Sequence, residues 1–515
     1  MNLIVTTEKG KVRGIETENV LAWYGIPFGK APVGELRFKR AQPAEAWDDV
    51  KDCTSYGNDP VQFIGAREKE DEDCLHVNVW APKDAVNLPV LVWFYGGGLH
   101  YGFNSDPSYD GARMASNGVI RVNINFRLGP LGYYDFNQYD DSFDTNCTLS
   151  DQIEGLKWVQ ENIAAFGGDP GNITIFGESG GGTAVYHLLA SPAAKGLFHK
   201  AIIQSGLPEL CGRRAFSKLL VPHFLDYIGL QPEEVFKLKT IDILKIKEAG
   251  SNLYRNFSTL YDGVHMPGAY IGDDLLPEYP WTAIKNGSAA GVDVIIGYTR
   301  DEGDTFIQST NESNAWFPSW ECVEGMLENN GKGEYYTELR SAYSDIGDDR
   351  EALSNFVTDY LFAKEAYRFA DYQVNHGKVW MYRFDFVPVA YKHMNMGAVH
   401  AVDIPFALDT LDRGYFANAL KGTPQDQTEA VRDQMNGAFL NFAKTGNPDG
   451  GIIDWPKYEG ENSLVHLFDL QPTNQDVRLN EKIFRVWGKI GVVYDSDEMF
   501  QHISSKAIGN ARLGS

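Results

Sequence analysis

Apolar runs alternate along this chain with segments whose apolar residues recur at helical spacing. Two short runs, LPVLVWFYGGG at 88–98 and NITIFG at 172–177, are each rich in β-formers and end in glycine. Between them, 148–168 is predicted to be an amphipathic helix stopped by the glycine pair at 167–168. Its apolar residues at spacings of three and four are Ile153, Leu156, Val159 and Ile163. Buried strands alternating with helices are typical of a mostly parallel sheet covered by helices on both faces.

Further apolar runs extend the predicted sheet. They lie at 118–129, 199–206, 291–298 and 378–386. Two stretches interrupt the alternation: 207–290 is mixed and more polar, and 305–375 is helix-like. We interpret both as insertions over the sheet that shape a substrate cleft, rather than as separate folding units. The pattern therefore predicts a single α/β domain over 1–515.

Charge and cysteine content narrow the function classes. The 515 residues include 46 Lys and Arg against 70 Asp and Glu, a net charge of −24. Such a surface is repelled by phosphate backbones and anionic lipid, so we expect neither a nucleic-acid nor a membrane partner. No window approaches the ~18 apolar residues of a membrane span, and we expect no cleaved secretory signal. Five cysteines without C-x-x-C spacing predict neither a disulfide scaffold nor a metal site. We therefore expect a cytoplasmic protein.

The sequence TIFGESGGGT at 174–183 is the most informative part of the chain. It places G-x-S-x-G between a predicted strand and a predicted helix, the context of a nucleophile elbow. Glycines at 177 and 181 remove side chains that would clash in so tight a turn, leaving the Ser179 hydroxyl exposed above the sheet. A phosphate-binding turn is the alternative, but this turn has no Lys or Arg and lacks G-x-G-x-x-G spacing. The motif therefore predicts a nucleophile whose neighbouring helix amides favour negative charge.

A nucleophilic serine needs a histidine base, which follows it along the chain in this fold class. The late histidines are His376, His393, His400, His466 and His502. His376 precedes a predicted strand, His466 lies within a strand-like run, and His502 belongs to the terminal segment. His393 and His400 both follow the strand at 378–386, at the end of the sheet where sites form. The pattern barely separates these two, although the more apolar surroundings in MGAVHAVDIPF favour His400.

The acid that orients the base is expected on a turn between the serine and the histidine. The segment GVDVIIGYTRDEGDTF at 291–306 provides a strand followed by Asp301, Glu302 and Asp304. The residue pattern does not choose among these three carboxylates.

Acyl transfer also requires donors for a tetrahedral oxyanion. Gly96, Gly97 and Gly98 follow the strand at 88–95 and can expose backbone amides with no side chain in the way. The amide of Gly180, next to the nucleophile, can provide another donor. The triple glycine is therefore predicted to be an oxyanion loop rather than an ordinary flexible loop.

With these features the sequence resembles the type-B carboxylesterase family of α/β-hydrolases. The length of chain over which motifs are shared favours the bacterial branch, that of the para-nitrobenzyl esterases. The shared motifs are YGIPFGKAPVGELRF (24–38), EDCLHVNVWAP (72–82), the GGG loop, NFRLGPLGY (125–133), FGGDPGNITIFGESGGG (166–182), QSG (204–206), TRDEG (299–303), HAVDIPF (400–406) and FAKTGNP (442–448). The resemblance implies an α/β-hydrolase fold and a cofactor-free serine esterase acting on small-molecule carboxylic esters. The roles it implies are Ser179 as nucleophile, Glu302 as acid, His400 as base, Gly97, Gly98 and Gly180 as oxyanion donors, and Glu178 and Ser205 as buried polar supports of the site.

Three departures from the family pattern stand out. Gly180 replaces a frequent alanine after the nucleophile, and Leu99-His100 replace the aromatic residue that commonly follows the glycine triplet. The only cysteine before Cys74 is Cys53, displaced from the place where cholinesterases close a loop, and 54–73 contain no tryptophan. This argues against a disulfide there and against choline esters.

The resemblance leaves two alternatives to an esterase: a non-catalytic adhesion-type binding protein on the same fold, or an amide or carbamate hydrolase. The aromatic residues of 207–290 and 305–345 either line an apolar cleft over the serine or form the core of the insertions. A lined cleft would suit short or medium acyl chains and aromatic alcohols better than long triglycerides. The sequence predicts neither the natural ester nor the oligomeric state.

Overall fold

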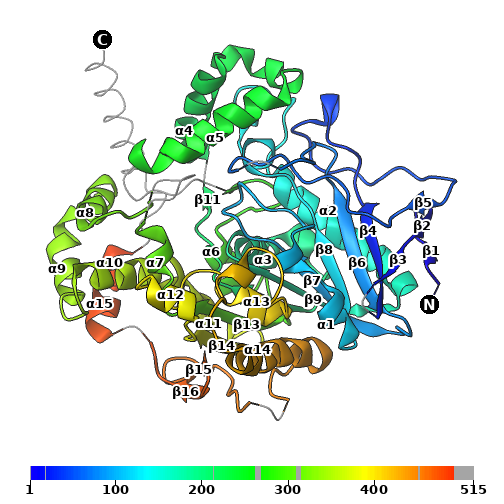
Figure 1. Cartoon of the computed structure of the whole chain (residues 1–515). Coiled ribbons are helices and arrows are strands. Elements are labelled where there is room, and N and C mark those ends of the chain that lie inside the picture. Colours follow the sequence, from blue (N-terminus) through cyan, green and yellow to red (C-terminus); the bar gives the residue numbers. More distant parts are fainter. Residues whose placement is uncertain are drawn as a thin grey trace.

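A large twisted sheet carries the described part of the chain (Figure 1). The computed structural model describes residues 2–17, 19–65, 67–212, 214–260, 268–308, 315–450, 453–478 and 480–491. Within these residues the sheet has 11 strands in the order β16-β15-β14-β13-β10-β9-β7-β8-β6-β4-β3. Their bounds are β3 Ile15–Thr17, β4 Val20–Pro27, β6 His76–Pro82, β7 Leu88–Phe94, β8 Ile120–Ile124, β9 Gly168–Glu178, β10 Lys200–Gln204, β13 Asp293–Thr299, β14 Val379–Phe384, β15 Val465–Phe468 and β16 Thr473–Gln475.

In the order of the sheet, the seven neighbouring strands β8, β7, β9, β10, β13, β14 and β15 pair in parallel. Antiparallel pairs, β6 with β8 and β15 with β16, lie at either side of them. The central strands are rich in buried apolar residues because helices cover both faces, and Ile173, Ile175 and Phe176 of β9 are fully buried. The register pairs Gln204 with both Glu178 and Gly297. The carboxyl ends of β9, β10 and β13 therefore lie side by side, where sites form in such sheets.

Two small sheets lie outside the main one. They comprise β1 (Ile4–Thr6), β2 (Lys11–Arg13) and β5 (Lys51–Asp52), and the pair β11 (Cys211–Gly212) and β12 (Ala269–Tyr270). The helices are α1 Ala112–Ser116, α2 Cys147–Asn162, α3 Gly180–Ala190, α4 Arg214–Ile228, α5 Ile243–Leu260, α6 Pro280–Lys285, α7 Gly303–Phe306, α8 Trp320–Asn329, α9 Tyr336–Ala342, α10 Asp349–Thr358, α11 Lys364–Gln373, α12 Val389–His393, α13 Ile404–Leu408, α14 Gln425–Thr445 and α15 Glu481–Ile490. No helix in these ranges is both long and apolar enough to cross a membrane.

The predicted strands and the helix after the serine are confirmed, but the helix predicted over 148–168 is too long. α2 ends at Asn162, and 163–166 continue as a 3₁₀ turn. Gly167 then adopts a φ of 83°, which allows the chain to reverse, and Gly168 already pairs with Leu88 as the start of β9. The glycine pair therefore belongs to the turn and the next strand rather than to the end of the helix.

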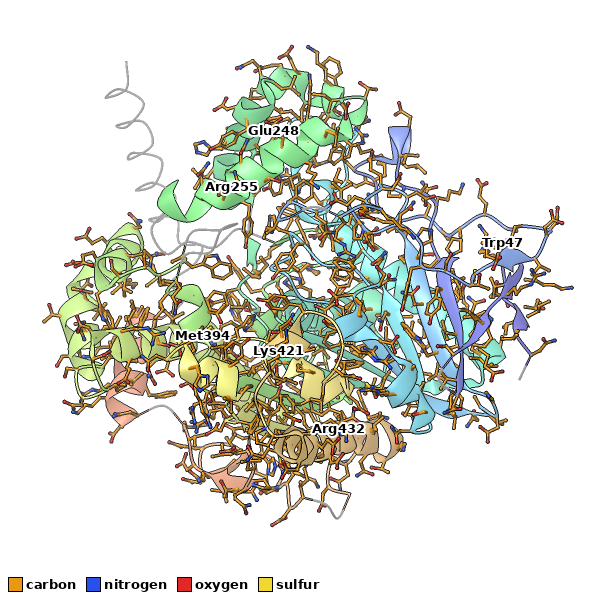
Figure 2. All side chains as sticks on the ribbon, viewed as in Figure 1. Trp47, Glu248, Arg255, Met394, Lys421 and Arg432 are labelled. Atoms are coloured by element: carbon orange, nitrogen blue, oxygen red, sulfur yellow. The ribbon has the colours of Figure 1, made fainter. Side chains whose placement is uncertain are left out.

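Helices fill the two predicted insertions. α4 and α5 pack on each other and project from the body at the top of Figure 1, and Glu248 and Arg255 mark α5 in Figure 2. α8, α9 and α10 form the second group, joined to α11 by a π-helical turn at 359–363. The predicted insertions also include 261–267 and 309–314, which lie outside the described residues, as does His502.

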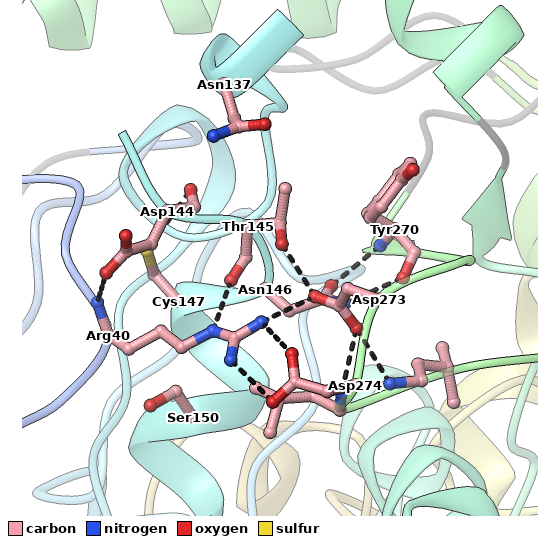
Figure 3. A network of polar contacts seen from close by, with 12 residues as sticks. Arg40, Asn137, Asp144, Thr145, Asn146, Cys147, Ser150, Tyr270, Asp273 and Asp274 are labelled. Carbon is pink, nitrogen blue, oxygen red and sulfur yellow. Dashed lines mark hydrogen bonds and ion pairs between the residues drawn. The ribbon is translucent and has the colours of Figure 1, made fainter. Parts of the chain in front are cut away.

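A polar network anchors the end of the first insertion to the body (Figure 3). Oδ2 of Asp273 accepts hydrogen bonds from Arg40, Thr145 and Asn146, at 2.9, 2.6 and 3.0 Å. Its Oδ1 accepts the backbone amides of 275 and 276. Asn146 also exchanges two hydrogen bonds with the Tyr270 backbone. One partly exposed carboxylate thus ties together three segments that are distant in sequence.

Candidate active site

Ser179 lies in the sharp turn between β9 and α3. Its φ of 55° and ψ of −121° fall in a region that non-glycine residues rarely adopt. The turn is held by hydrogen bonds from the Ser179 amide to the Gln204 carbonyl and from the Thr183 amide to the Ser179 carbonyl. A Cβ on Gly181 would overlap the carbonyl oxygen of Phe94, so this position requires glycine. The chain accepts a strained serine because its neighbours leave it no other conformation.

The structure brings together the side chains of Ser179, Glu302 and His400 from three distant segments. Nε2 of His400 lies 2.8 Å from Oγ of Ser179, and Nδ1 lies 2.5 Å from Oε2 of Glu302. Glu302 follows β13, and His400 lies in the loop between α12 and α13. The Glu302 carboxylate is fully buried, while the His400 side chain is 10% exposed. This chain of contacts can carry a proton from the hydroxyl to an oriented imidazole.

The second oxygen of Glu302 is held from two sides. Oε1 accepts the Ser205 hydroxyl at 2.5 Å and the Thr299 amide at 2.7 Å. Ser205 follows β10 directly and is itself buried. These donors fix the carboxylate so that its other oxygen points toward Nδ1 of His400.

The other candidates for acid and base have different contacts. His393 ends α12 and is exposed, away from the serine. Asp301 accepts the Ala398 amide at 2.7 Å and Asp304 accepts the Gly397 amide at 2.9 Å. Both aspartates therefore anchor the loop that carries His400, a role that their spacing in the sequence does not reveal.

The glycine loop after β7 lies close to Gly180, the residue that follows the serine. Gly97 and Gly98 adopt φ values of +111° and +57°, in the region that favours glycine. A Cβ on Gly180 would stand 3.1 Å from the amide nitrogens of both Gly98 and Leu99. The loop thus approaches Gly180 so closely that a side chain at this position would require the loop to shift by a few tenths of an ångström.

The whole chain was then compared with known proteins. The family model described as the carboxylesterase family matches residues 1–487. The chain belongs to this family. It is 36% identical to the para-nitrobenzyl esterase of Bacillus subtilis (strain 168) over 493 residues, covering 93% of this chain and 97% of the relative. It is 32% identical to human cocaine esterase over 500 residues, covering 90% and 85%.

Solved structures agree with this assignment. A PNB esterase structure matches with a TM-score of 0.83 at 35% identity, covering 94% of this chain and 100% of the other. A carboxylesterase from Geobacillus stearothermophilus matches with a TM-score of 0.82 at 32% identity, with the same coverage. The predicted α/β-hydrolase fold and the predicted activity, serine-dependent hydrolysis of carboxylic esters, are thereby confirmed. A binding-only protein and an amide or carbamate hydrolase are not favoured.

Burial and charge set the ionisation of the esterase's imidazole. Burial alone lowers the pKa of His400, but the carboxylates of Glu178 and Glu302 outweigh it and raise the pKa to about 9. Burial raises the pKa of Glu178 to about 8, with His400 opposing. Oε1 of Glu178 lies 3.3 Å from Nε2 of His400, so the two groups compete for one proton. A proton on Glu178 removes the charge that does most to raise the pKa of His400.

Residues from both insertions reach the active site of the enzyme. The rings of Phe306 and Phe362 each lie 5.0 Å from the His400 ring, and Trp316 packs on Phe306 at 4.8 Å. Tyr254 of α5 packs against His100 at 4.9 Å. Other aromatics of the second insertion, among them Trp320, Phe356 and Tyr360, instead pack with one another and with α15. Trp320 thus belongs to the core of its insertion, whereas Phe306 and Trp316 lie beside His400.

The sequence analysis did not predict several contacts of this site. Phe306 and Phe362 carry no motif, and only the fold brings them to His400. Asp403 accepts hydrogen bonds from Gln204 and Tyr382, both at 3.0 Å, and its burial raises its pKa to about 6. Its place three residues after His400, in an apolar run, was the available signal.

Proposed function

We propose that Ser179, His400 and Glu302 form the catalytic triad of this esterase. His400 Nε2 accepts the proton of Ser179 Oγ while this oxygen bonds to the ester carbonyl carbon. Glu302 holds the imidazole in the tautomer with hydrogen on Nδ1 and stabilises the imidazolium. The 2.8 Å and 2.5 Å contacts of His400 are the observation that supports the proposal.

The amides of Gly97, Gly98 and Gly180 are proposed to hold the oxyanion of each tetrahedral intermediate. Collapse of the first intermediate expels the alcohol, which takes the proton from His400. Water then attacks the acyl-enzyme, giving its proton to His400, and the second collapse releases the acid and restores Ser179. No metal or organic cofactor takes part in these steps. Glu178 and Ser205 support the site, Glu178 through its carboxyl group beside Nε2 of His400 and Ser205 through its hydrogen bond to Glu302.

The substrate is proposed to be a small ester with a short or medium acyl chain or an aromatic alcohol. The rings of Phe306 and Phe362 beside His400 support an apolar binding surface near the reacting atoms. The net charge of −24 supports the absence of a nucleic-acid partner. Strands from both ends of the chain share one sheet, which supports a single catalytic domain over 1–515. We propose that the protein is cytoplasmic.

Replacing Ser179 with alanine tests the assignment. S179A should retain the wild-type circular dichroism and thermal melt but lose para-nitrophenyl acetate turnover by a factor on the order of 10⁴ or more. Ser191, a buried serine just beyond the other end of α3, provides the matched control S191A, which should keep its activity. Undiminished turnover in S179A would refute the triad.

A further inference from the structure

His100 lies two residues beyond the proposed oxyanion donors and is 1% exposed. Its Nδ1 lies 2.8 Å from the carbonyl oxygen of Gly98. Because a carbonyl oxygen can only accept, Nδ1 carries the hydrogen and donates it. Burial lowers the pKa of His100 to about 4, against the effect of this hydrogen bond, so the ring is neutral at pH 7. The imidazole is therefore a neutral hydrogen-bond donor to the glycine loop.

The carbonyl that His100 binds belongs to the peptide between Gly98 and Leu99. Leu99 has a φ of 65°, in the left-handed region that branched side chains avoid. Beyond it, the Leu99 carbonyl accepts the Gly129 amide at 2.8 Å, and the His100 carbonyl accepts the Phe63 amide at 2.9 Å. The loop is thus fixed after Leu99 by the body of the protein, and the hydrogen bond from His100 fixes the peptide before it.

Rotation of this peptide by half a turn is the rearrangement that the hydrogen bond opposes. It would bring the φ of Leu99 to about −115°, an ordinary value, and would relieve the backbone strain. It would also exchange the two ends of the peptide. The Leu99 nitrogen now stands 3.1 Å from where a Cβ on Gly180 would lie, so the rotation would bring the Gly98 oxygen toward Gly180. A carbonyl oxygen there would repel the negative charge that develops on the substrate.

We propose that His100 is a positioning residue for the oxyanion hole: its hydrogen bond keeps the Gly98 carbonyl oxygen turned away from the reacting carbonyl. The proposal rests on the proposed roles of Gly97, Gly98 and Gly180. His100 touches neither the substrate nor the triad in this role. Its effect should therefore appear in the stabilisation of the tetrahedral state and not in the binding of the intact ester.

The test compares a variant without the donor, H100F, with one that keeps a donor, H100N, using para-nitrophenyl acetate. We expect H100F to lower kcat by about 10-fold or more, with KM within about twofold, because the released Gly98 carbonyl oxygen can then turn toward the developing oxyanion. The inhibition constant of an alkyl trifluoromethyl ketone, which forms a tetrahedral adduct with the serine, should rise by the same factor as kcat/KM falls. H100N should recover most of both losses.

Controls separate this effect from a general loss of packing. His466 is another buried histidine with a single ring hydrogen bond, from Nδ1 to Asn474 at 2.9 Å, and H466F should leave kcat within about twofold of wild type. H100L is made in parallel so that a donor-free variant is available if the phenyl ring prevents folding. A donor-free variant with wild-type kcat, an unchanged ketone inhibition constant, or equal losses in H100N would overturn the proposal. Wild-type protein that a fluorophosphonate does not label at Ser179 would instead refute the proposed function.

Discussion

Replacing Glu178 with glutamine removes a charge from the immediate surroundings of His400 while keeping the size of the side chain. Oε1 of Glu178 lies 3.3 Å from Nε2 of His400, and both side chains are largely buried. Glu178 is the largest of the causes that oppose burial and raise the pKa of His400 to about 9. At an effective dielectric constant of about 20, two unit charges at this distance interact by about 5 kcal/mol.

Only part of this energy acts on the base. Burial raises the pKa of Glu178 to about 8, so its carboxyl is largely protonated at pH 7 and loses its proton chiefly when His400 gains one. We therefore expect E178Q to lower the pKa of His400 by about 1–2 pH units, or about 1.4–2.7 kcal/mol. The base must be neutral to act, so kcat/KM rises with pH through the pKa of His400 in the free enzyme. Loss of the charge moves this rise to lower pH.

The assay is the pH dependence of kcat/KM for para-nitrophenyl acetate, measured from about pH 5 to 10 for wild type and E178Q. Asp359 provides the control, because it is a buried carboxyl whose burial raises its pKa to about 7 and which hydrogen-bonds Tyr343 rather than the triad. D359N should leave unchanged the pH at which kcat/KM rises, the acidic limb of the pH profile. An acidic limb that stays in place in E178Q, or that moves equally in D359N, would refute this account of the charge beside His400.

Three further predictions concern the proposed triad acid Glu302, the polar network around Asp273 and the acyl-chain preference. E302Q should lower kcat by a factor of about 10³–10⁴ in steady-state kinetics with KM within about twofold, and a loss below tenfold would contradict its role. D273N should lower the free energy of unfolding in urea by about 1–3 kcal/mol, because five hydrogen bonds converge on this carboxylate. Its exposed neighbour gives the control, D274N, which should cost less than about 1 kcal/mol, and equal losses would contradict the anchor. For a series of para-nitrophenyl esters, kcat/KM should fall beyond medium acyl chains, whereas a steady rise, above all at an oil–water interface, would indicate a lipase.

The sheet and the nucleophile could be predicted from the sequence because both are local features. The apolar runs give β7, β9, β10, β13 and β14 to within a few residues, since strands buried on both faces need uninterrupted apolar sequence. Ser179 is recognisable for the same reason, since the glycines that permit its turn are its immediate neighbours.

The acid and the base that accompany the nucleophile could be identified only from the tertiary structure. Asp301, Glu302 and Asp304 share one turn, and only the tertiary structure directs Glu302 to the imidazole and the other two to the loop amides of 397 and 398. His393 and His400 were likewise separable only once α12 left the former exposed. Exposed Met394, labelled in Figure 2, lies in the same loop and shows how sharply burial changes on the way to His400. Such differences depend on packing between distant segments, which residue spacing does not encode.

The most direct measurement is to map the adduct formed by a fluorophosphonate with the wild-type protein. The account predicts one phosphonyl group per chain, located by peptide mass spectrometry on Ser179, with the extent of labelling proportional to the loss of esterase activity. An adduct on another residue, or full activity in protein labelled to completion at Ser179, would contradict it.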